Sequence, residues 1–556
     1  MKPLRWVVLA MLLLLSTNSV APQEVPSTAE SERIEVLLAS MPLEAKVAQM
    51  FMVNLFGPTL TDAGRDMLET WGPGAVVLLN SNVEDRSPDQ VAELINTYQQ
   101  TITTAGGVPL FVAVDQEGGL IQRLQTGFTT WPVPMLLTAA DDADLAYRVG
   151  QGMAMELRAV GVNMNLAPVA DLYTNRANPV IGRRSFGSFP TPVGQAVAAV
   201  IRGMQAEDVV ATVKHFPGHG DTSEDSHLTL PVLDLNRARL DAIELPPFIA
   251  ALEVGVGAVM GAHIWYPALE PETNRPASLS TGVMTDLLRD DLGYDGIAIT
   301  DALDMDAIDT VYSPEQAAIQ AIIAGNDMVL IGANAGEAIQ ARAMQAVVDA
   351  VWAGDIGEAR IDASVRRVLQ AKLEFGVLDA EPISLPVLMP TEANAALVTE
   401  MFQVGVTVAQ DQAELLPVAD DHTIGVVFPG TRYSIRNACE PYRDDVIWRA
   451  VSGSPTAADV SGMALLASQV DVMVVFTQNV DFDPSQAGLV NALPPEKTVV
   501  VALQSPFDLL AFPTISTYLM TYSPLDAALD AACAAIFGAL TPSYRPAVDL
   551  SAANTE

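Results

Sequence analysis

The stretch VVATVKHF, residues 209–216, is an apolar run that ends in a lysine and a histidine. Apolar residues at consecutive positions, rather than at alternate ones, are typical of a strand buried on both faces. Seven further runs of this kind occur in the first two thirds of the chain. The eight runs are 50–56, 74–80, 109–117, 162–171, 209–216, 257–265, 296–305 and 326–332.

The segments between these runs have the length of helices. Residues 87–106, SPDQVAELINTYQQTITTAG, are one example, and residues 140–161 are another. Eight alternations of strand and helix predict an α/β fold, a (β/α)8 TIM-like barrel, which we place at residues 32–376. A doubly wound parallel sheet has the same alternation and is the alternative.

The composition changes after Gly376. A proline-rich stretch at 377–395 predicts a linker. Beyond it, apolar runs alternate with helical segments and predict a smaller α/β sandwich domain at residues 396–545, with a tail at 546–556. These runs are 423–430, 470–478, 498–506 and 516–524. Because the domain lacks a cluster of catalytic residue types, we expect it to support the barrel.

The N-terminus has the pattern of an export signal. It starts with two basic residues, continues with an apolar run at 6–15 and reaches a small-residue cleavage pattern at 19–21. The run is shorter than the roughly 20 residues that cross a membrane. We predict a signal peptide at 1–21, a linker at 22–31, and a secreted, extracellular or cell-envelope protein. An uncleaved anchor is the alternative, and no other run is long enough to be an integral membrane segment.

Composition excludes some classes of function. The net charge of −38 excludes a general nucleic-acid binder, because a phosphate backbone requires a basic face. Half of the residues are apolar, which indicates a globular chain. The two cysteines, Cys439 and Cys533, are too few for a metal cluster. We expect them to be structural or unpaired, and export would permit a disulfide bond.

Polar residues gather at the carboxyl ends of the eight runs. They are Asn54, Asn80, Asp115, Asp171, Lys214, His215, His263 and Asp301. Barrel enzymes carry their catalytic groups at this end of several strands. Asp301, in the segment IAITDALDM, is therefore a candidate nucleophile or a carboxylate that stabilises positive charge. A helix N-cap is an equally good interpretation of Asp301.

Three of the five histidines of the chain, His215, His219 and His227, fall in KHFPGHGDTSEDSHLTLP, residues 214–231. A turn can bring Asp225 within hydrogen-bonding reach of His227. A carboxylate on one ring nitrogen fixes the tautomer and favours the protonated imidazole. Such a pair is suited to proton transfer near neutral pH.

Lys214 and His215 stand at the end of the strand, where they would hold a polar ligand, and His219 would brace the loop. A zinc site built from the three histidines is the alternative. No HExxH motif or compact helical spacing of ligands is present. We therefore predict no metal and no cofactor.

Other charged residues are expected around the same mouth. Asp115 lies at a strand end with Arg123 eight residues on, and Arg184 lies in a loop rich in proline and glycine. A ring of such donors and acceptors suits a hydroxyl-rich ligand such as a sugar, and a phosphorylated ligand would also fit. His263 is either part of this mouth or a residue of the wall beside Trp265.

Several segments resemble glycoside hydrolase family 3, and specifically its β-N-acetylglucosaminidases. In the first domain they are VDQEGG (114–119), NLAPVADLYTNRANPVIGRRSFG (165–187), KHFPGHGDTSEDSHLTLP (214–231), VMGAHIWYPAL (259–269) and ITDALDM (299–305). In the second they are TVAQDQAELLPV (407–418), LQSPFDL (503–509) and YSP (522–524).

The resemblance implies a retaining exo-β-N-acetylglucosaminidase that acts on cell-wall or chitin-type oligosaccharides through a covalent glycosyl-enzyme. It implies that Asp301 is the nucleophile, that His227 is the acid/base and that Asp225 is its partner. The residues that it implies for binding the N-acetylglucosamine unit are Asp115, Arg123, Arg184, Lys214 and His215. A family 3 β-glucosidase and a non-catalytic glycan-binding protein are the alternatives.

Two positions depart from the family pattern. Leu120 stands where the family commonly has arginine, and Arg183 stands where aspartate is common. The first change removes a charge and the second reverses one. We expect both near the rim of the pocket, where they would alter the preference for substrates.

Overall fold

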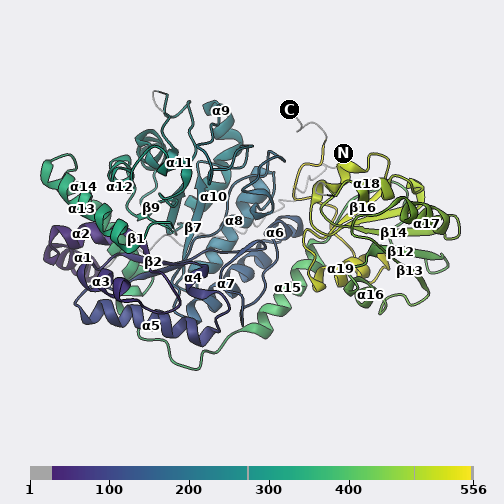
Figure 1. Cartoon of the computed structure of the whole chain (residues 1–556), viewed down its shortest axis with the longest axis horizontal. Helices are drawn as coiled ribbons and strands as arrows, with labels where there is room; N and C mark the ends of the chain where they lie inside the picture. Colours follow the sequence, from purple (N-terminus) through teal and green to yellow (C-terminus); the bar gives the residue numbers. More distant parts are fainter. Residues whose placement is uncertain (1–27, 272–273, 333, 481–482, 552–556) are drawn as a thin grey trace, which may run out of the picture.

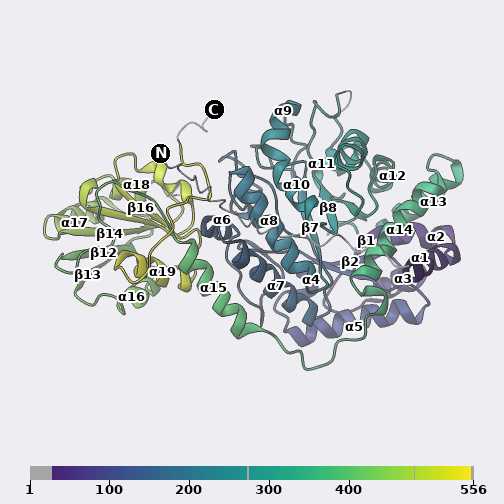
Figure 2. The same ribbon diagram turned by 180° about the vertical axis from the view of Figure 1, so that it is seen from behind.

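The computed structural model describes residues 28–551 except 272–273, 333 and 481–482 (Figure 1). The predicted signal peptide lies outside these residues. The chain forms two bodies, a larger one at residues 28–379 and a smaller one after α15 (Thr391–Gly405) (Figures 1 and 2). No helix in the described part of the chain combines the length and the apolar character needed to cross a membrane.

The larger body is a barrel of eight parallel strands. Its strands are β1 (Phe51–Asn54), β2 (Ala75–Leu78), β3 (Phe111–Val114), β6 (Met164–Asn165), β7 (Val210–Phe216), β8 (Ala258–Gly261), β9 (Ile297–Thr300) and β10 (Val329–Leu330). Their order is β10-β1-β2-β3-β6-β7-β8-β9. The barrel closes because the N–H of Met328 donates to the carbonyl of Ala298 at 3.0 Å, next to β10. The predicted barrel is thus confirmed, and the doubly wound sheet is wrong.

Helices cover the outside of the barrel (Figure 1). The main ones are α3 (Asp62–Thr70), α5 (Pro88–Thr104), α7 (Ala143–Ala159), α8 (Pro190–Gln205), α10 (Pro246–Glu253), the π-helix η4 (Gly282–Asp291), α12 (Pro314–Ala324), α13 (Glu337–Ala353) and α14 (Glu358–Glu374). The start of α5 shows how the sequence determines where such a helix begins. Ser87 caps the helix through the N–H of Gln90, and Pro88 occupies the first turn, where no donor is needed.

The strands of the barrel are buried on both faces, as their sequences predict. In β3, Phe111 and Ala113 point into the barrel, whereas Val112 and Val114 pack with the helix layer. The inward side chains of Leu166, Met260 and Leu330 close the interior near the carboxyl ends of the strands. These three side chains are the floor of the cavity described below.

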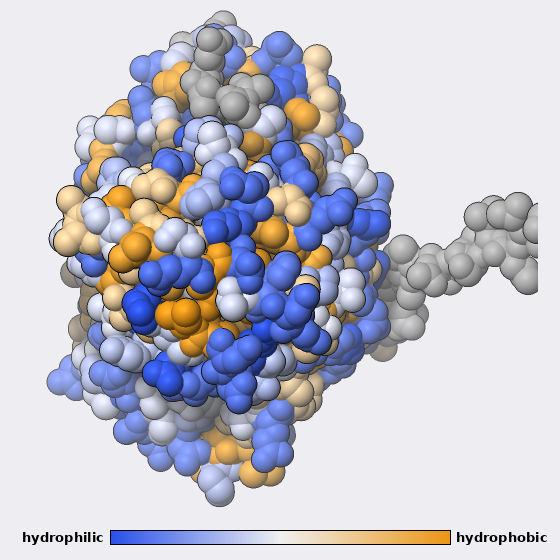
Figure 3. Space-filling model, turned by 90° about the vertical axis from the view of Figure 1, so that its right-hand side faces the viewer, coloured by the Kyte–Doolittle hydropathy of each residue, from blue (hydrophilic) through white to orange (hydrophobic). Residues whose placement is uncertain are grey.

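The second body is a six-stranded sheet flanked by helices. Its strands are β11 (Thr407–Asp411), β12 (Ile424–Pro429), β13 (Val446–Val451), β14 (Val472–Thr477), β15 (Thr498–Ala502) and β16 (Thr517–Met520). Their order is β11-β16-β15-β14-β12-β13, with only the β11–β16 pair antiparallel. Four of these strands are the predicted runs. Figure 3 shows the end of this domain, where apolar patches are surrounded by polar side chains.

A disulfide bond joins Cys439, at the end of α16 (Ser434–Cys439), to Cys533 in α19 (Asp526–Ile536). The two Cα atoms are 5.0 Å apart, and the residue numbers of the two cysteines differ by 94. The bond therefore closes a long loop of the second domain, and loops of that size gain the most from closure in the chain-entropy account.

The chain after α19 returns to the barrel. Ser543 accepts from the N–H of Val408 at 2.8 Å, and its hydroxyl donates to the carbonyl of Ala139 at 2.9 Å. Ala547 then accepts from the N–H of Ser188 at 3.0 Å. Residues 543–549, which we call the return segment, thus bond with both domains.

Candidate active site

A cavity of about 460 Å³ opens at the carboxyl ends of the barrel strands. Eight side chains expected at this mouth line it together. They are Asp115, Arg123, Arg184, Lys214, His215, Asp225, His227 and Asp301. They come from β7, from the segment after β9, and from three loops. These are the β3 loop (residues 115–134), the β6 loop (residues 166–189) and the loop that follows β7, residues 217–230, which we call the His227 loop.

Two cations and two carboxylates form a compact network on one wall. Lys214 Nζ lies 2.7 Å from Asp115 Oδ1 and 2.7 Å from Glu117 Oε1. Arg184 holds Glu117 with two bonds, Nη2 to Oε1 at 2.8 Å and Nε to Oε2 at 2.9 Å. Two positive and two negative charges balance, so the wall offers donors and acceptors without net charge. Arg123 lies further out, 3.8 Å from Asp115.

The network stays ionised although it is buried. Burial alone would raise the pKa of Glu117, but Lys214 and Arg184 outweigh it and hold that pKa well below its usual range. Burial alone would lower the pKa of Lys214, yet the carboxylates of Asp115 and Glu117 raise it. Glu117 was missed from the sequence. It lies two residues after Asp115, and that spacing places both side chains on one face of an extended chain.

Asp301 follows β9 and faces the same cavity. Its Oδ1 accepts from the N–H of Ala302 at 2.7 Å. Burial alone would raise its pKa. His263 and His215 oppose this effect most, and together with Lys214 they bring the pKa of Asp301 to about 2. The alternative of a helix N-cap is wrong, because the next helix, α11 (Asp306–Asp309), begins after Met305.

This pKa predicts how the nucleophile responds to acid. A lowered pKa keeps Asp301 ionised as pH falls, until pH approaches about 2. A 5-fluoro-N-acetylglucosaminide with a dinitrophenolate leaving group needs no proton to react. Its rate of inactivation, measured under single-turnover conditions, should therefore stay constant from pH 7 to about pH 4. Circular dichroism at each pH is the control. The lowered pKa of Asp301 would be contradicted if the inactivation rate of the folded protein fell with decreasing pH and showed an apparent pKa of about 4 or above.

Asp171 fixes the turn after β7 from behind. It is fully buried and accepts from the backbone N–H of His215 at 3.2 Å and of His219 at 2.7 Å. Its Oδ2 also lies 2.6 Å from His215 Nδ1. Because this bond occupies Nδ1, the Nε2 atom is the one left for a ligand. Sequence reasoning placed Asp171 at the mouth, whereas the structure places it under the two histidines.

The Asp225–His227 pair lies on the His227 loop. Asp225 Oδ1 accepts from the backbone N–H of His227 at 2.8 Å and lies 2.9 Å from its Nδ1. Burial alone would raise the pKa of Asp225, but the hydrogen bonds from His227 lower it, so the carboxylate stays ionised. It therefore holds the proton on Nδ1 and leaves Nε2 for the cavity. The side chain of His227 is 59% exposed, so substrate and water reach it.

His219 braces the His227 loop. Burial lowers the pKa of His219 to about 4, and its Nε2 lies 2.9 Å from the hydroxyl of Ser226. Its ring is thus neutral at physiological pH and bonds to the residue before His227. Among the described residues, no three His, Cys, Asp or Glu side chains converge as a metal site. That the protein needs no metal ion stays a prediction.

His263 is a wall residue and does not line the cavity. Its Nδ1 lies 2.7 Å from the hydroxyl of Ser278, and its Nε2 lies 2.9 Å from the carbonyl of Ala302. A carbonyl can only accept, so Nε2 carries the proton. Burial lowers the pKa of His263, and the nearby carboxylate of Asp301 opposes this effect. The ring therefore supports the backbone next to Asp301.

Asp304 joins the loops after β9 and β10. Its Oδ1 accepts from the N–H of Gly332 at 2.9 Å, and its carbonyl accepts from Asn334 Nδ2 at 3.1 Å. Asp304 and Asn334 both line the cavity. Long-range bonds of this kind leave no pattern in the sequence.

The two departures from the family pattern lie in different places. Leu120 is 56% exposed at the rim of the cavity, as expected. Arg183 is a correction, because it does not line the cavity. Burial lowers its pKa, whereas the neighbouring Tyr173 and Asp508, the latter in the second domain, oppose this effect. Arg183 therefore faces the domain interface.

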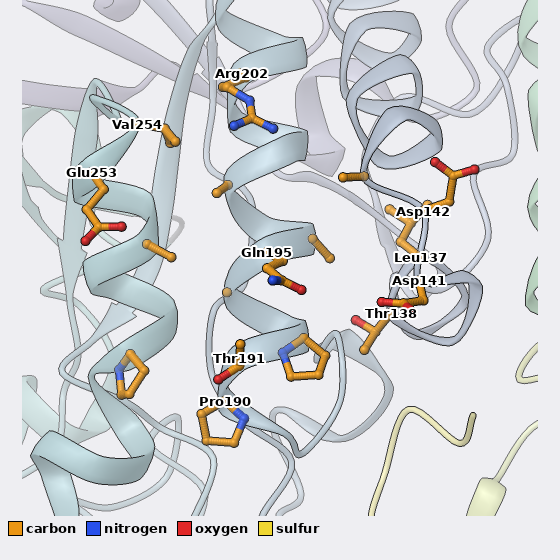
Figure 4. Close-up of a pocket in the computed structure, with 17 residues that line it drawn as sticks. Leu137, Thr138, Asp141, Asp142, Pro190, Thr191, Gln195, Arg202, Glu253 and Val254 are labelled. Carbon is orange, nitrogen blue, oxygen red and sulfur yellow. The ribbon is translucent and has the colours of Figure 1, made fainter. Parts of the chain in front are cut away.

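A groove of about 590 Å³ lies outside the barrel, along α8 (Figure 4). Figure 4 shows Arg202 on α8 and Glu253 on the neighbouring α10. The groove shares no residue with the cavity at the strand ends and carries none of the predicted catalytic side chains. We therefore assign the candidate site to the cavity.

A parallel barrel with an ionised carboxylate at a strand end, a proton carrier and a ring of polar groups is the architecture of a barrel glycosidase. The family model for the glycosyl hydrolase family 3 N-terminal domain matches residues 42–371. The chain belongs to glycosyl hydrolase family 3.

Relatives and solved structures agree with this membership. The chain is 32% identical over 389 residues to "Beta-hexosaminidase A" of Pseudoalteromonas piscicida, covering 64% of this chain and 64% of that protein. It therefore spans somewhat less than two thirds of that relative. A family 3 β-N-acetylglucosaminidase from Paenibacillus sp. str. FPU-7 superposes with a TM-score of 0.80 at 36% identity, covering 92% of this chain and 99% of that chain.

More distant structures share the fold. A β-glucosidase from Listeria innocua superposes with a TM-score of 0.76 at 19% identity, covering 93% of this chain and 76% of that one. At this identity the likeness concerns the arrangement of the two domains alone.

Proposed function

We propose that the chain is a retaining exo-β-N-acetylglucosaminidase, which removes terminal β-linked N-acetylglucosamine from oligosaccharides. The observation that carries the proposal is the Asp225–His227 pair in the same cavity as Asp301. Most glycosidases use two carboxylates, one of them kept protonated. Here the histidine supplies the proton. The named relatives, a β-hexosaminidase and a β-N-acetylglucosaminidase, support this substrate.

In the first step, Asp301 attacks the anomeric carbon and forms a covalent bond to it. The glycosidic C–O bond breaks, and the Nε2–H of His227 protonates the departing oxygen. The ionised Asp225 stabilises the imidazolium that donates this proton. Because the pKa of Asp301 is about 2, the nucleophile is ionised throughout the neutral range.

In the second step, the neutral His227 takes a proton from water. The resulting hydroxyl oxygen attacks the anomeric carbon, and the bond to Asp301 breaks. The sugar leaves with its original configuration after two inversions. Lys214, His215 and Arg184 would hold the sugar, together with Asp115 and Arg123. The charge-balanced wall suits a neutral sugar, because it presents hydrogen-bonding groups without net charge.

The proposal also covers the location of the enzyme and the origin of its substrate. A basic and apolar N-terminus followed by a cleavage pattern supports export. The Cys439–Cys533 bond also supports it, because such bonds persist in oxidising compartments. We place the enzyme outside the cytoplasm, secreted or in the cell envelope. Cell-wall fragments, as in peptidoglycan turnover, and chitin-type oligosaccharides are its substrates.

Two chromogenic substrates test the activity. Purified chain from residue 22 should hydrolyse p-nitrophenyl β-N-acetylglucosaminide with a kcat/KM roughly 100-fold or more above that for the β-glucoside, because groups that bind the acetamide are left unpaired by glucose. Equal or better hydrolysis of the glucoside would identify a β-glucosidase. Binding of N-acetylglucosamine in calorimetry without turnover of either substrate would identify a glycan-binding protein.

A further inference from the structure

The β6 loop lies between the second domain and the His227 loop. It carries Arg184 at one end, in the short helix η1 (Gly182–Arg184), and Asp171 near the other. Both residues belong to the site. Pro179 and Val180 of the β6 loop also line the cavity, whereas Tyr173 and Arg176 contact the second domain.

One aromatic side chain forms the centre of this contact. Phe507 belongs to η7 (Pro506–Ala511) of the second domain and is buried. Its ring packs edge-on against Tyr173 of the β6 loop, with centroids 5.2 Å apart. The guanidinium of Arg176 lies 5.7 Å from the same ring. Such aromatic pairs contribute beyond the area that they bury.

The opposite side of the β6 loop holds the His227 loop. The hydroxyl of Thr174 donates to Asp221 Oδ1 at 2.9 Å, and Asn175 Nδ2 donates to the carbonyl of Asp221 at 3.1 Å. Asn178 Nδ2 donates to the carbonyl of His219 at 2.8 Å. Thr174 and Asn175 lie between Tyr173 and Arg176 in the sequence. Two of the three residues that hold the His227 loop are therefore flanked by the two that contact Phe507.

The return segment holds the end of the β6 loop. Ser188 donates from its N–H to the carbonyl of Ala547 at 3.0 Å, and its hydroxyl accepts from the N–H of Asp549 at 2.7 Å. A Cβ on Gly187 would lie 2.1 Å from the same Ala547 carbonyl, so the two backbones are in close contact. The β6 loop is thus fixed to the second domain at Tyr173 and at Ser188, on either side of Arg184.

We propose that Phe507 is a positioning residue, through which the second domain sets the place of the two loops that carry Arg184 and His227. The proposal rests on the proposed function for its kinetic consequence. The second domain contributes no side chain to the described cavity lining and acts through the β6 loop. Displacement of the His227 loop would separate the proton donor from the substrate oxygen, and small errors of position are costly in catalysis.

The test compares Phe507→Ala with two matched variants in the full chain. Phe507→Ala should lower kcat/KM for chitobiose about 10- to 100-fold, with a rise in KM as well as a fall in kcat. Phe507→Tyr retains the ring and should keep most of the activity. Phe428→Ala removes a buried ring of the same domain that packs against Tyr433 and Trp448 instead. This variant should have a lower Tm. At assay temperatures below that Tm, its kcat/KM should stay within about twofold of the parent value.

Hydrogen exchange gives a readout that needs no substrate. In Phe507→Ala, peptides from residues 173–189 and 217–230 should lose protection about tenfold, while peptides from the other barrel loops stay unchanged. Tyr173→Ala removes the same contact from the barrel side and should have a similar effect. The double variant should lose no more than either single one.

The outcomes separate this inference from the proposed function. If the parent enzyme turns over no N-acetylglucosaminide, the proposed function is wrong, and hydrogen exchange still decides the role of Phe507. Unchanged protection of both loops in Phe507→Ala and Tyr173→Ala would overturn the inference. An equal loss of kcat/KM in Phe428→Ala would overturn it too, since any destabilised second domain would then suffice.

Discussion

Asp301→Ala should lower kcat for p-nitrophenyl β-N-acetylglucosaminide by about 10⁴-fold or more, because it removes the carboxylate that we propose forms the glycosyl-enzyme. The fold should persist, since the carboxylate contributes charge and not packing, and circular dichroism checks this. Azide should restore part of the turnover by attacking from the vacated face, with an α-glycosyl azide as its product. Detection of that product by NMR would show the inverted configuration.

Asp306→Ala is the matched control. Asp306 lies five residues further on and is exposed at the start of α11. The Asp306→Ala variant should keep the activity of the parent. In the parent, mass spectrometry of digested protein should find the 5-fluoro sugar on Asp301. A label on any other carboxylate would disprove the assignment, whatever the activity of the variant.

His227→Ala should slow the cleavage of substrates to different degrees, according to the basicity of their leaving groups. Nitrophenolate leaves without much help, whereas a sugar hydroxyl needs a proton. Cleavage of chitobiose should therefore fall about 10²- to 10⁴-fold, the usual contribution of acid–base catalysis, while the first step with dinitrophenyl N-acetylglucosaminide changes little. Because the second step still needs a base, the glycosyl-enzyme should accumulate, and stopped-flow absorbance should show a burst of dinitrophenolate. Azide should speed turnover because it attacks without a base.

Two neighbours serve as controls for His227. Asp225→Ala should give a milder form of the same pattern, since the imidazole remains but loses its orienting partner. Glu224→Ala, an exposed carboxylate on the same loop, should behave as the parent. His227 would be a binding residue if His227→Ala lost activity equally on chitobiose and on the dinitrophenyl substrate, showed no burst and did not respond to azide. Glu224 would then be the next candidate for the acid.

The barrel was predictable because parallel strands buried on both faces leave continuous apolar runs, and all eight runs contain a strand. The strands β11 and β13 were missed for the opposite reason. Both are partly exposed, and β13 is an edge strand with the exposed side chains Ile447 and Arg449. Their sequences therefore lack an unbroken apolar run.

The mouth of the site was predictable from polar residues that directly follow those runs. Glu117 and Asp304 were not found, because each works through partners that lie far away in the sequence. Glu117 holds Lys214 and Arg184, whereas Asp304 holds the loop after β10. The position of Arg183 was mistaken for a related reason. Its environment includes Asp508 of the second domain, and the barrel sequence alone does not indicate this neighbour.

The return segment has a consequence for biosynthesis. Residues 543–549 are translated after both domains, yet they bond with the barrel at Ala139 and Ser188. Domains generally fold as units, the N-terminal one first, while the ribosome is still at work. A nascent chain thus passes through a stage in which the barrel has formed and the β6 loop lacks its outer anchor. Full activity would therefore appear only after residues 543–549 have been synthesised and have bonded with the barrel.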